Sequence, residues 1–90
     1  MSISFPNASR SYYAARNAVC FWGHDQSMEA SFFISADALR QLMPGAAAGE
    51  SALLEAFDRN LARIREAAVR IYGRTNRGGS FELNPSDFSA

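Results

Sequence analysis

The sequence predicts a small α+β protein, in which an antiparallel sheet built on a β-hairpin packs against one long C-terminal amphipathic helix and one short helix. Apolar and polar residues alternate along residues 27–34, which is the spacing of a strand with one buried face. Apolar residues recur at helical spacing along residues 52–73. A chain of 90 residues has the length of one domain, so we expect residues 1–90 to fold as a single unit.

The hairpin is predicted from two segments rich in aromatic and β-branched residues, 17–23 and 27–34, with a turn over residues 23–26. Side chains of a strand alternate between its two faces. On the returning strand, the residues expected to face the core are Met28, Ala30, Phe32 and Ile34. The first strand is apolar on both faces, which are formed by Val19 with Phe21 and by Cys20 with Trp22. Such a strand is either covered on both sides or meets another chain.

The long helix is expected over residues 52–73, with Ser51 as its N-cap and Gly73 as its end, and no glycine or proline interrupts it. Its apolar residues fall in an arc of about 100°, the width of a core-facing stripe. The stripe consists of Leu53, Leu54, Phe57, Leu61, Ile64, Ala68, Ile71 and Tyr72.

The short helix is predicted over residues Ala36–Met43, where Ser35 is suited to the N-cap and Pro44-Gly45 ends the helix. The other predicted elements are a short edge strand over residues 2–5, a turn or short strand over 9–16, a last strand over 80–83 and a final turn over 85–88.

The residues that carry most enzyme chemistry are scarce in this sequence. His24 is the only histidine and Cys20 the only cysteine, and the carboxylates show no metal-ligand spacing. Cys20 lies in the middle of a predicted strand, where it is expected to be a small buried residue and not a nucleophile. No glycine-rich phosphate loop and no apolar run long enough for a membrane span is present. We therefore expect no enzyme activity, no cofactor and no bound metal.

The basic residues are all arginine, and nine acidic residues balance them. Five of these arginines lie on the polar face of the long helix or just after it: Arg59, Arg63, Arg70, Arg74 and Arg77. Such a stripe contacts phosphates in some nucleic-acid-binding proteins. The helical spacing also allows the ion pairs Glu55–Arg59, Arg63–Glu66 and Glu66–Arg70. The pairing favours a solvent-exposed face and leaves nucleic-acid binding as the alternative.

Aromatic residues are numerous for so small a core. The excess on the second face of the first strand favours a contact between two copies of the chain, with Cys20, Trp22 and Phe33 as candidate interface residues.

A further guide is a resemblance that covers nearly the full length. The resembling segments are Ile3-Ser4-Phe5-Pro6, Val19-Cys20-Phe21-Trp22-Gly23, Ala30-Ser31-Phe32-Phe33-Ile34, Ala38-Leu39, the helix from Leu53 to Tyr72, Phe81-Glu82-Leu83 and Asp87-Phe88. In these segments the chain resembles the small bacterial family catalogued as domain of unknown function 1488. The resemblance implies a compact α+β fold and a cytoplasmic bacterial protein, and it implies no activity and no site residues.

The sequence therefore favours a cytoplasmic, non-enzymatic module for protein–protein interaction or regulation that acts as a homodimer, with a further protein partner unidentified. The alternative is a nucleic-acid-associated protein that uses the arginine-rich helix face.

Overall fold

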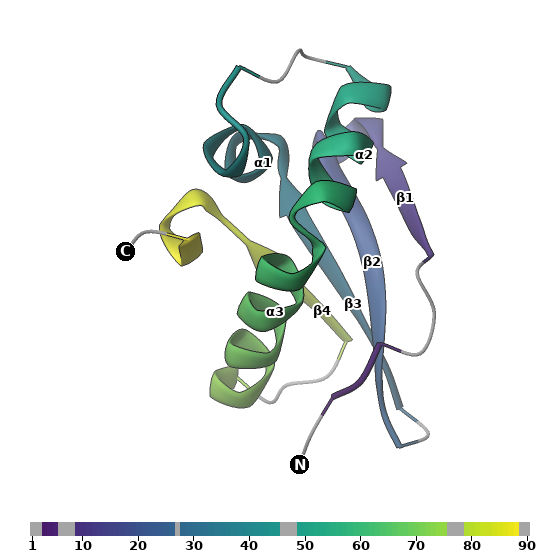
Figure 1. The fold of residues 1–90 in the computed structure, drawn as a ribbon. Coiled ribbons are helices and arrows are strands. Elements are labelled where there is room, and N and C mark those ends of the chain that lie inside the picture. The colour runs from purple at the N-terminus through teal and green to yellow at the C-terminus, as the bar shows by residue number, and fades with distance from the viewer. Residues whose placement is uncertain (1–2, 6–8, 27, 46–48, 76–78, 89–90) are drawn as a thin grey trace.

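The computed structural model describes residues 3–5, 9–26, 28–45, 49–75 and 79–88. Within these ranges the elements follow in the order β1 (Arg10–Tyr13), the 3₁₀ turn η1 (Ala14–Arg16), β2 (Ala18–Asp25), β3 (Met28–Ser35), α1 (Ala36–Leu42), α2 (Glu50–Arg59), α3 (Leu61–Thr75), β4 (Gly79–Leu83) and the 3₁₀ turn η2 (Pro85–Phe88). The α+β class predicted from the sequence is confirmed (Figure 1).

The sheet has the strand order β1-β2-β3-β4. Neighbouring strands are antiparallel from β1 to β3, but β4 runs parallel to β3. The prediction of a purely antiparallel sheet was therefore wrong. Parallel strands require a long crossover connection. All three α-helices lie in the chain between β3 and β4, and they carry it back across the sheet so that β4 starts beside the beginning of β3 (Figure 1).

The central hairpin is confirmed, and it is longer than predicted. The pairing extends to Asp25 opposite Met28, so His24 belongs to β2 and not to the turn. Only residues 26 and 27 separate the two strands, and Gln26 takes the left-handed backbone conformation (φ 59°) that a tight hairpin turn requires. Ala30, Phe32 and Ile34 are buried in the core, as the alternation predicted. The expectation was wrong for Met28, which lies at the hairpin end of β3 and is 63% exposed.

The N-terminal region adds to the edge of the sheet beside β2. Of the predicted edge strand over residues 2–5, the structure describes residues 3–5, and among these Ser4 alone pairs, through two reciprocal backbone hydrogen bonds of 2.8 Å with His24. Residues 9–16 were predicted as a turn or a short strand, and they contain both, as β1 followed by η1.

The long helix is divided at Asn60 into α2 and α3, so the prediction of one uninterrupted helix was wrong. The Asn60 side-chain amide donates to the carbonyl of Ala56 at 2.9 Å, and Asn60 itself leaves the helical conformation (φ −117°, ψ 23°). Asparagine side chains compete with the backbone for such bonds, which is a reason for helices to break at them. The apolar stripe nevertheless continues across the break, from Phe57 in α2 to Ile64 in α3.

The ends of the divided helix also differ from the prediction. Gly49, at φ 118°, takes the N-cap position and Ser51 lies inside α2, while α3 continues past Gly73 to Thr75. The short helix agrees with its prediction, because the Ser35 hydroxyl accepts a hydrogen bond from the Ala38 backbone N–H at 3.1 Å.

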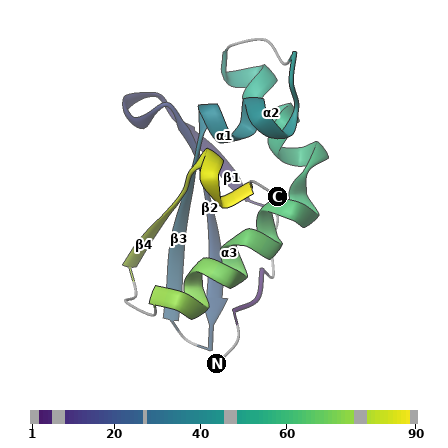
Figure 2. The same cartoon turned by 90° about the vertical axis from the view of Figure 1, so that its left-hand side faces the viewer.

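The three α-helices cover one face of the sheet (Figure 2). The core on this face contains a row of stacked rings from three adjacent strands, Phe21, Phe32 and Phe81, with centroids 5.3 and 5.2 Å apart. Phe57 of α2 packs on Phe21 at 5.2 Å, and Tyr72 of α3 packs on Phe81 at 5.5 Å. Aromatic contacts thus join α2 and α3 to the two ends of this row, and aliphatic side chains of the helices, among them Leu39, Leu53 and Ile64, complete the same core.

Gly23 is required where the N-terminal segment crosses β2. A Cβ atom at this position would lie 2.8 Å from Ile3 Cδ1 and 2.9 Å from Phe5 Cε1. Both side chains pack against the core, so neither can move away freely. We predict that Gly23→Ala lowers the free energy of unfolding by about 1–3 kcal/mol, as overpacking does elsewhere, measured by urea denaturation.

The matched control is Gly73→Ala. Gly73 lies within α3, has open space around it and does not have a positive φ. Alanine there should raise the free energy of unfolding by about 0.5–1 kcal/mol, because glycine disfavours the helix. Equal effects of the two substitutions would show that the close approach at Gly23 is unimportant.

Candidate functional site

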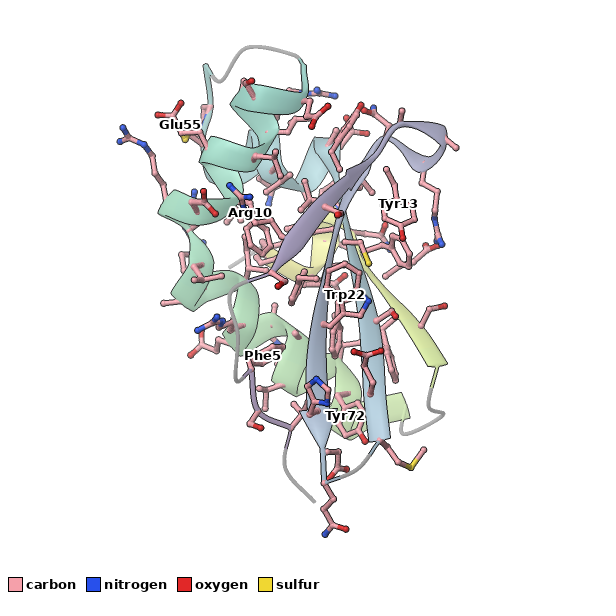
Figure 3. All side chains as sticks on the ribbon, turned by 90° about the vertical axis from the view of Figure 1, so that its right-hand side faces the viewer. Phe5, Arg10, Tyr13, Trp22, Glu55 and Tyr72 are labelled. Carbon is pink, nitrogen blue, oxygen red and sulfur yellow. The ribbon has the colours of Figure 1, made fainter. Side chains whose placement is uncertain are left out.

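The sheet has a second face, on the side away from the α-helices, which we call the open face. The strand register assigns to it Ser11, Tyr13, Ala18, Cys20, Trp22, His24, Glu29, Ser31, Phe33, Ser35, Ser80 and Glu82. No α-helix among the described residues lies against it (Figures 1 and 2). Figure 3 shows Tyr13 and Trp22 on this side of the ribbon.

Aromatic side chains form the middle of the open face. Tyr13 meets the Phe33 ring edge-on, with centroids 5.3 Å apart and planes at 84°. Tyr13 is 42% exposed, and Trp22 and Phe33 are each partly exposed. The Arg16 guanidinium lies 3.9 Å from the centroid of the Phe33 ring. It also forms an ion pair with Glu82, the residue of β4 that is paired with Phe33. This is a cation–π contact held in place by a carboxylate.

Cys20 is paired with Phe33 on this face and is buried, although it does not belong to the core cluster on the helix side. Burial raises the pKa of its thiol to about 11. The positive charge of Arg16 lowers the pKa of the Cys20 thiol, and the negative charge of Glu29 raises it. Both charges therefore lie close enough to Cys20 to affect its ionisation. A thiol in this environment is protonated at neutral pH and lacks the activation that a nucleophilic cysteine needs.

The hairpin end of the open face is acidic and polar. His24 Nε2 lies 3.7 Å from Glu29 Oε2, and the Glu29 side chain is 58% exposed. On the helix side of the same hairpin, the Tyr72 hydroxyl donates to Asp25 Oδ2 at 2.7 Å, and this bond to a carboxylate raises the pKa of Tyr72. The described residues contain no group of three or more His, Cys, Asp or Glu side chains placed to hold a metal ion.

The open face unites the three interface residues selected from the sequence. Cys20 is paired with Phe33 across the two central strands, and Trp22 is the next residue on the same face of β2. Sequence reasoning did not select Tyr13 or Arg16 as interface residues, because the conformation of residues 9–16 was left open. The sequence signal for these two residues was the arginine that follows Tyr13 by three positions, next to the first strand of the predicted hairpin.

The predicted arginine face is only partly present in the structure. Arg59 is paired with Glu55 at 3.0 Å, as predicted. Arg70 donates instead to the backbone carbonyl of Asp87 at 2.8 Å. Neither of the two predicted pairs with Glu66, from Arg63 and from Arg70, is present in the described part of the chain.

The remaining two arginines of that face cannot be placed. The side chain of Arg74 and the whole of Arg77 lie outside what the structure describes. The described part of the chain has no helix with the length and apolar character needed to cross a membrane.

Comparisons with known proteins agree with the fold. The sequence profile of the family described as "Protein of unknown function (DUF1488)" matches residues 3–83. The crystal structure of a protein of unknown function from the same family, from Shewanella loihica PV-4, is similar with a TM-score of 0.81 and 19% sequence identity over 91% of each chain. Among curated proteins, none matches the sequence. Because the family profile spans most of its length, the chain belongs to the DUF1488 family.

Proposed function

We propose that this protein is a non-enzymatic module for protein–protein interaction or regulation, and that it acts as a homodimer through the open face. The observation that carries the proposal is the partly exposed cluster of Tyr13, Trp22 and Phe33 on a sheet face that no described helix covers. Sheets with apolar side chains on both faces are normally covered on both, by helices, by another sheet or by a second chain. Aromatic residues and arginine are also enriched in protein interfaces.

The size of the open face suits a reversible dimer. β2 and β3 each contain eight residues. With about 3.3 Å per residue and about 4.8 Å between strands, the face measures about 26 Å by 15–19 Å. Stable complexes bury about 800 Å² on each partner, and the outline of this face, about 400–500 Å², lies below that value. We therefore expect association in the micromolar range and not an obligate dimer.

The geometry gives less support to the alternatives. Cys20 is the only thiol, and it is buried with a raised pKa. For nucleic-acid binding, Arg59 and Arg70 are already engaged with Glu55 and with the Asp87 carbonyl. Only Arg63 remains as a described, exposed arginine of that face without such a partner.

The absence of nucleophilic chemistry at Cys20 can be tested by alkylation. At pH 7 a thiol with a pKa of about 11 is ionised in roughly one molecule in 10,000. Iodoacetamide should therefore label the native protein far more slowly than the urea-unfolded chain, and the native rate should increase as the pH rises towards 11. Mass spectrometry follows the reaction at this single cysteine. Fast labelling of the folded protein at pH 7 would contradict the non-enzymatic assignment.

Homodimer formation can be tested with two exposed apolar residues on opposite sides of the molecule. Tyr13 on the open face is 42% exposed, and Val69 on α3 is 46% exposed. We predict that Tyr13→Lys weakens self-association at least about tenfold in sedimentation equilibrium, because it places a charge in an apolar contact. Val69→Lys introduces the same charge outside the proposed interface and should leave self-association unchanged.

The wild-type protein supplies the decisive outcome. A strict monomer at concentrations up to about 1 mM, where even weak specific contacts are populated, would exclude the homodimer. Equal effects of both lysine substitutions would instead place the contact somewhere other than the open face.

A further inference from the structure

We infer that the two copies meet with their open faces related by a twofold axis that runs across the strands near Trp22, so that Arg16 of each copy lies against the partner's Glu29. The inference rests on the proposed homodimer and adds its geometry: which residues meet, and in which orientation.

The open face has an arginine, paired with Glu82, at one end and an exposed glutamate at the other. Arg16 lies over Phe33, near the start of β2, whereas Glu29 lies beside His24 at the hairpin end. Phe33 and Glu29 are four residues apart on β3, which corresponds to about 13 Å along the strand. Cys20 is paired with Phe33 at the arginine end, and the pKa of its thiol is affected by both charges.

Symmetry limits how such a face can meet a copy of itself. In a face-to-face dimer the twofold axis lies in the plane of the interface, so any contact of residue i with residue j of the partner occurs twice, and only residues on the axis meet their own counterparts. An axis along the strands would bring equal ends together, with the two Arg16 side chains at one end and the two Glu29 side chains at the other. Like charges facing each other disfavour association. An axis across the strands reverses one copy and brings each arginine to the opposite glutamate.

The position of the axis follows from the spacing of the two charges. Ser31 is halfway between Phe33 and Glu29 on β3, and it is paired with Trp22 on β2. An axis at this level places Trp22 against the partner's Trp22. Two packed sheets lie about 10 Å apart, with their strands turned by about 30°. Two facing indole rings can fill the space between sheets at that distance.

Both charged groups retain capacity for the contact. Arg16 binds Glu82 through Nη2 alone, and a guanidinium has five N–H donors. The same arginine can therefore bridge Glu82 and the partner's Glu29. Glu29 is exposed, and its only ion-pair partner within the described residues is His24, at the long distance of 3.7 Å.

A charge exchange tests this orientation. Arg16→Glu and Glu29→Arg each place like charges together twice in the dimer, so each variant alone should associate at least about tenfold more weakly than wild type in sedimentation equilibrium. An equimolar mixture of the two variants forms a heterodimer in which both contacts are between opposite charges. The mixture should associate within about threefold of wild type, a rescue that a misfolded chain could not provide.

Two further measurements separate the possible failures. Glu82→Gln removes the pairing within one chain but keeps Arg16, and it should leave association nearly unchanged. Trp22 is the only tryptophan, so its fluorescence emission should shift to shorter wavelength as wild type associates, and should not shift in the Arg16→Glu variant at the same concentration.

The outcomes distinguish the orientation from the dimer itself. If both single variants associate like wild type, or if the mixture gains nothing over the separate variants, this orientation is wrong. The homodimer would still stand in that case, provided that Tyr13→Lys disrupts it. If wild type does not associate at all, the proposed function and the orientation both fail.

Discussion

The aromatic row Phe21, Phe32 and Phe81 is the contact on which the rest of the fold depends. It crosses β2, β3 and β4 at one register level, and it includes the only parallel pair among the described strands. The two strands of the parallel pair, β3 and β4, are far apart in sequence, so their pairing is expected to form slowly during folding. The stacked rings stabilise this pairing once it has formed. Phe57 and Tyr72 then attach α2 and α3 to opposite ends of the row.

Because the rings lie on one face of the sheet, α1, α2 and α3 all pack against that face. The segment between β3 and β4 holds the three α-helices, and each docks on the side where the rings are. β1 is fastened to the same layer, because Arg10 binds Asp58 of α2 through two hydrogen bonds of 3.0 and 2.8 Å (Figure 3). No α-helix of the described chain is left to cover the open face, and Tyr13, Trp22 and Phe33 on that side remain partly exposed.

Local patterns were enough to predict the elements but not how they connect. Alternation placed Phe32 and Ile34 in the core, and Ser35 was recognised as the cap of α1 because a serine there can bond to the helix start. The break at Asn60 depends on a single side-chain bond to Ala56, which helical periodicity does not register. The direction of β4 depends on where the long crossover ends in space. Five residues with alternating side chains are compatible with either direction.

The same division applies to the open face. Parity along β2 and β3 was sufficient to bring Cys20, Trp22 and Phe33 together, because side chains two residues apart must share a face. Parity could not show that Arg16 reaches Phe33 and Glu82, since that contact requires the chain to turn through η1 and fold back over the sheet. Without Arg16 the face has aromatic side chains and two carboxylates, Glu29 and Glu82, and no arginine to pair with them. With it, the face has a basic end and, at Glu29, an acidic end, and a surface with opposite charges at its two ends is complementary to a reversed copy of itself.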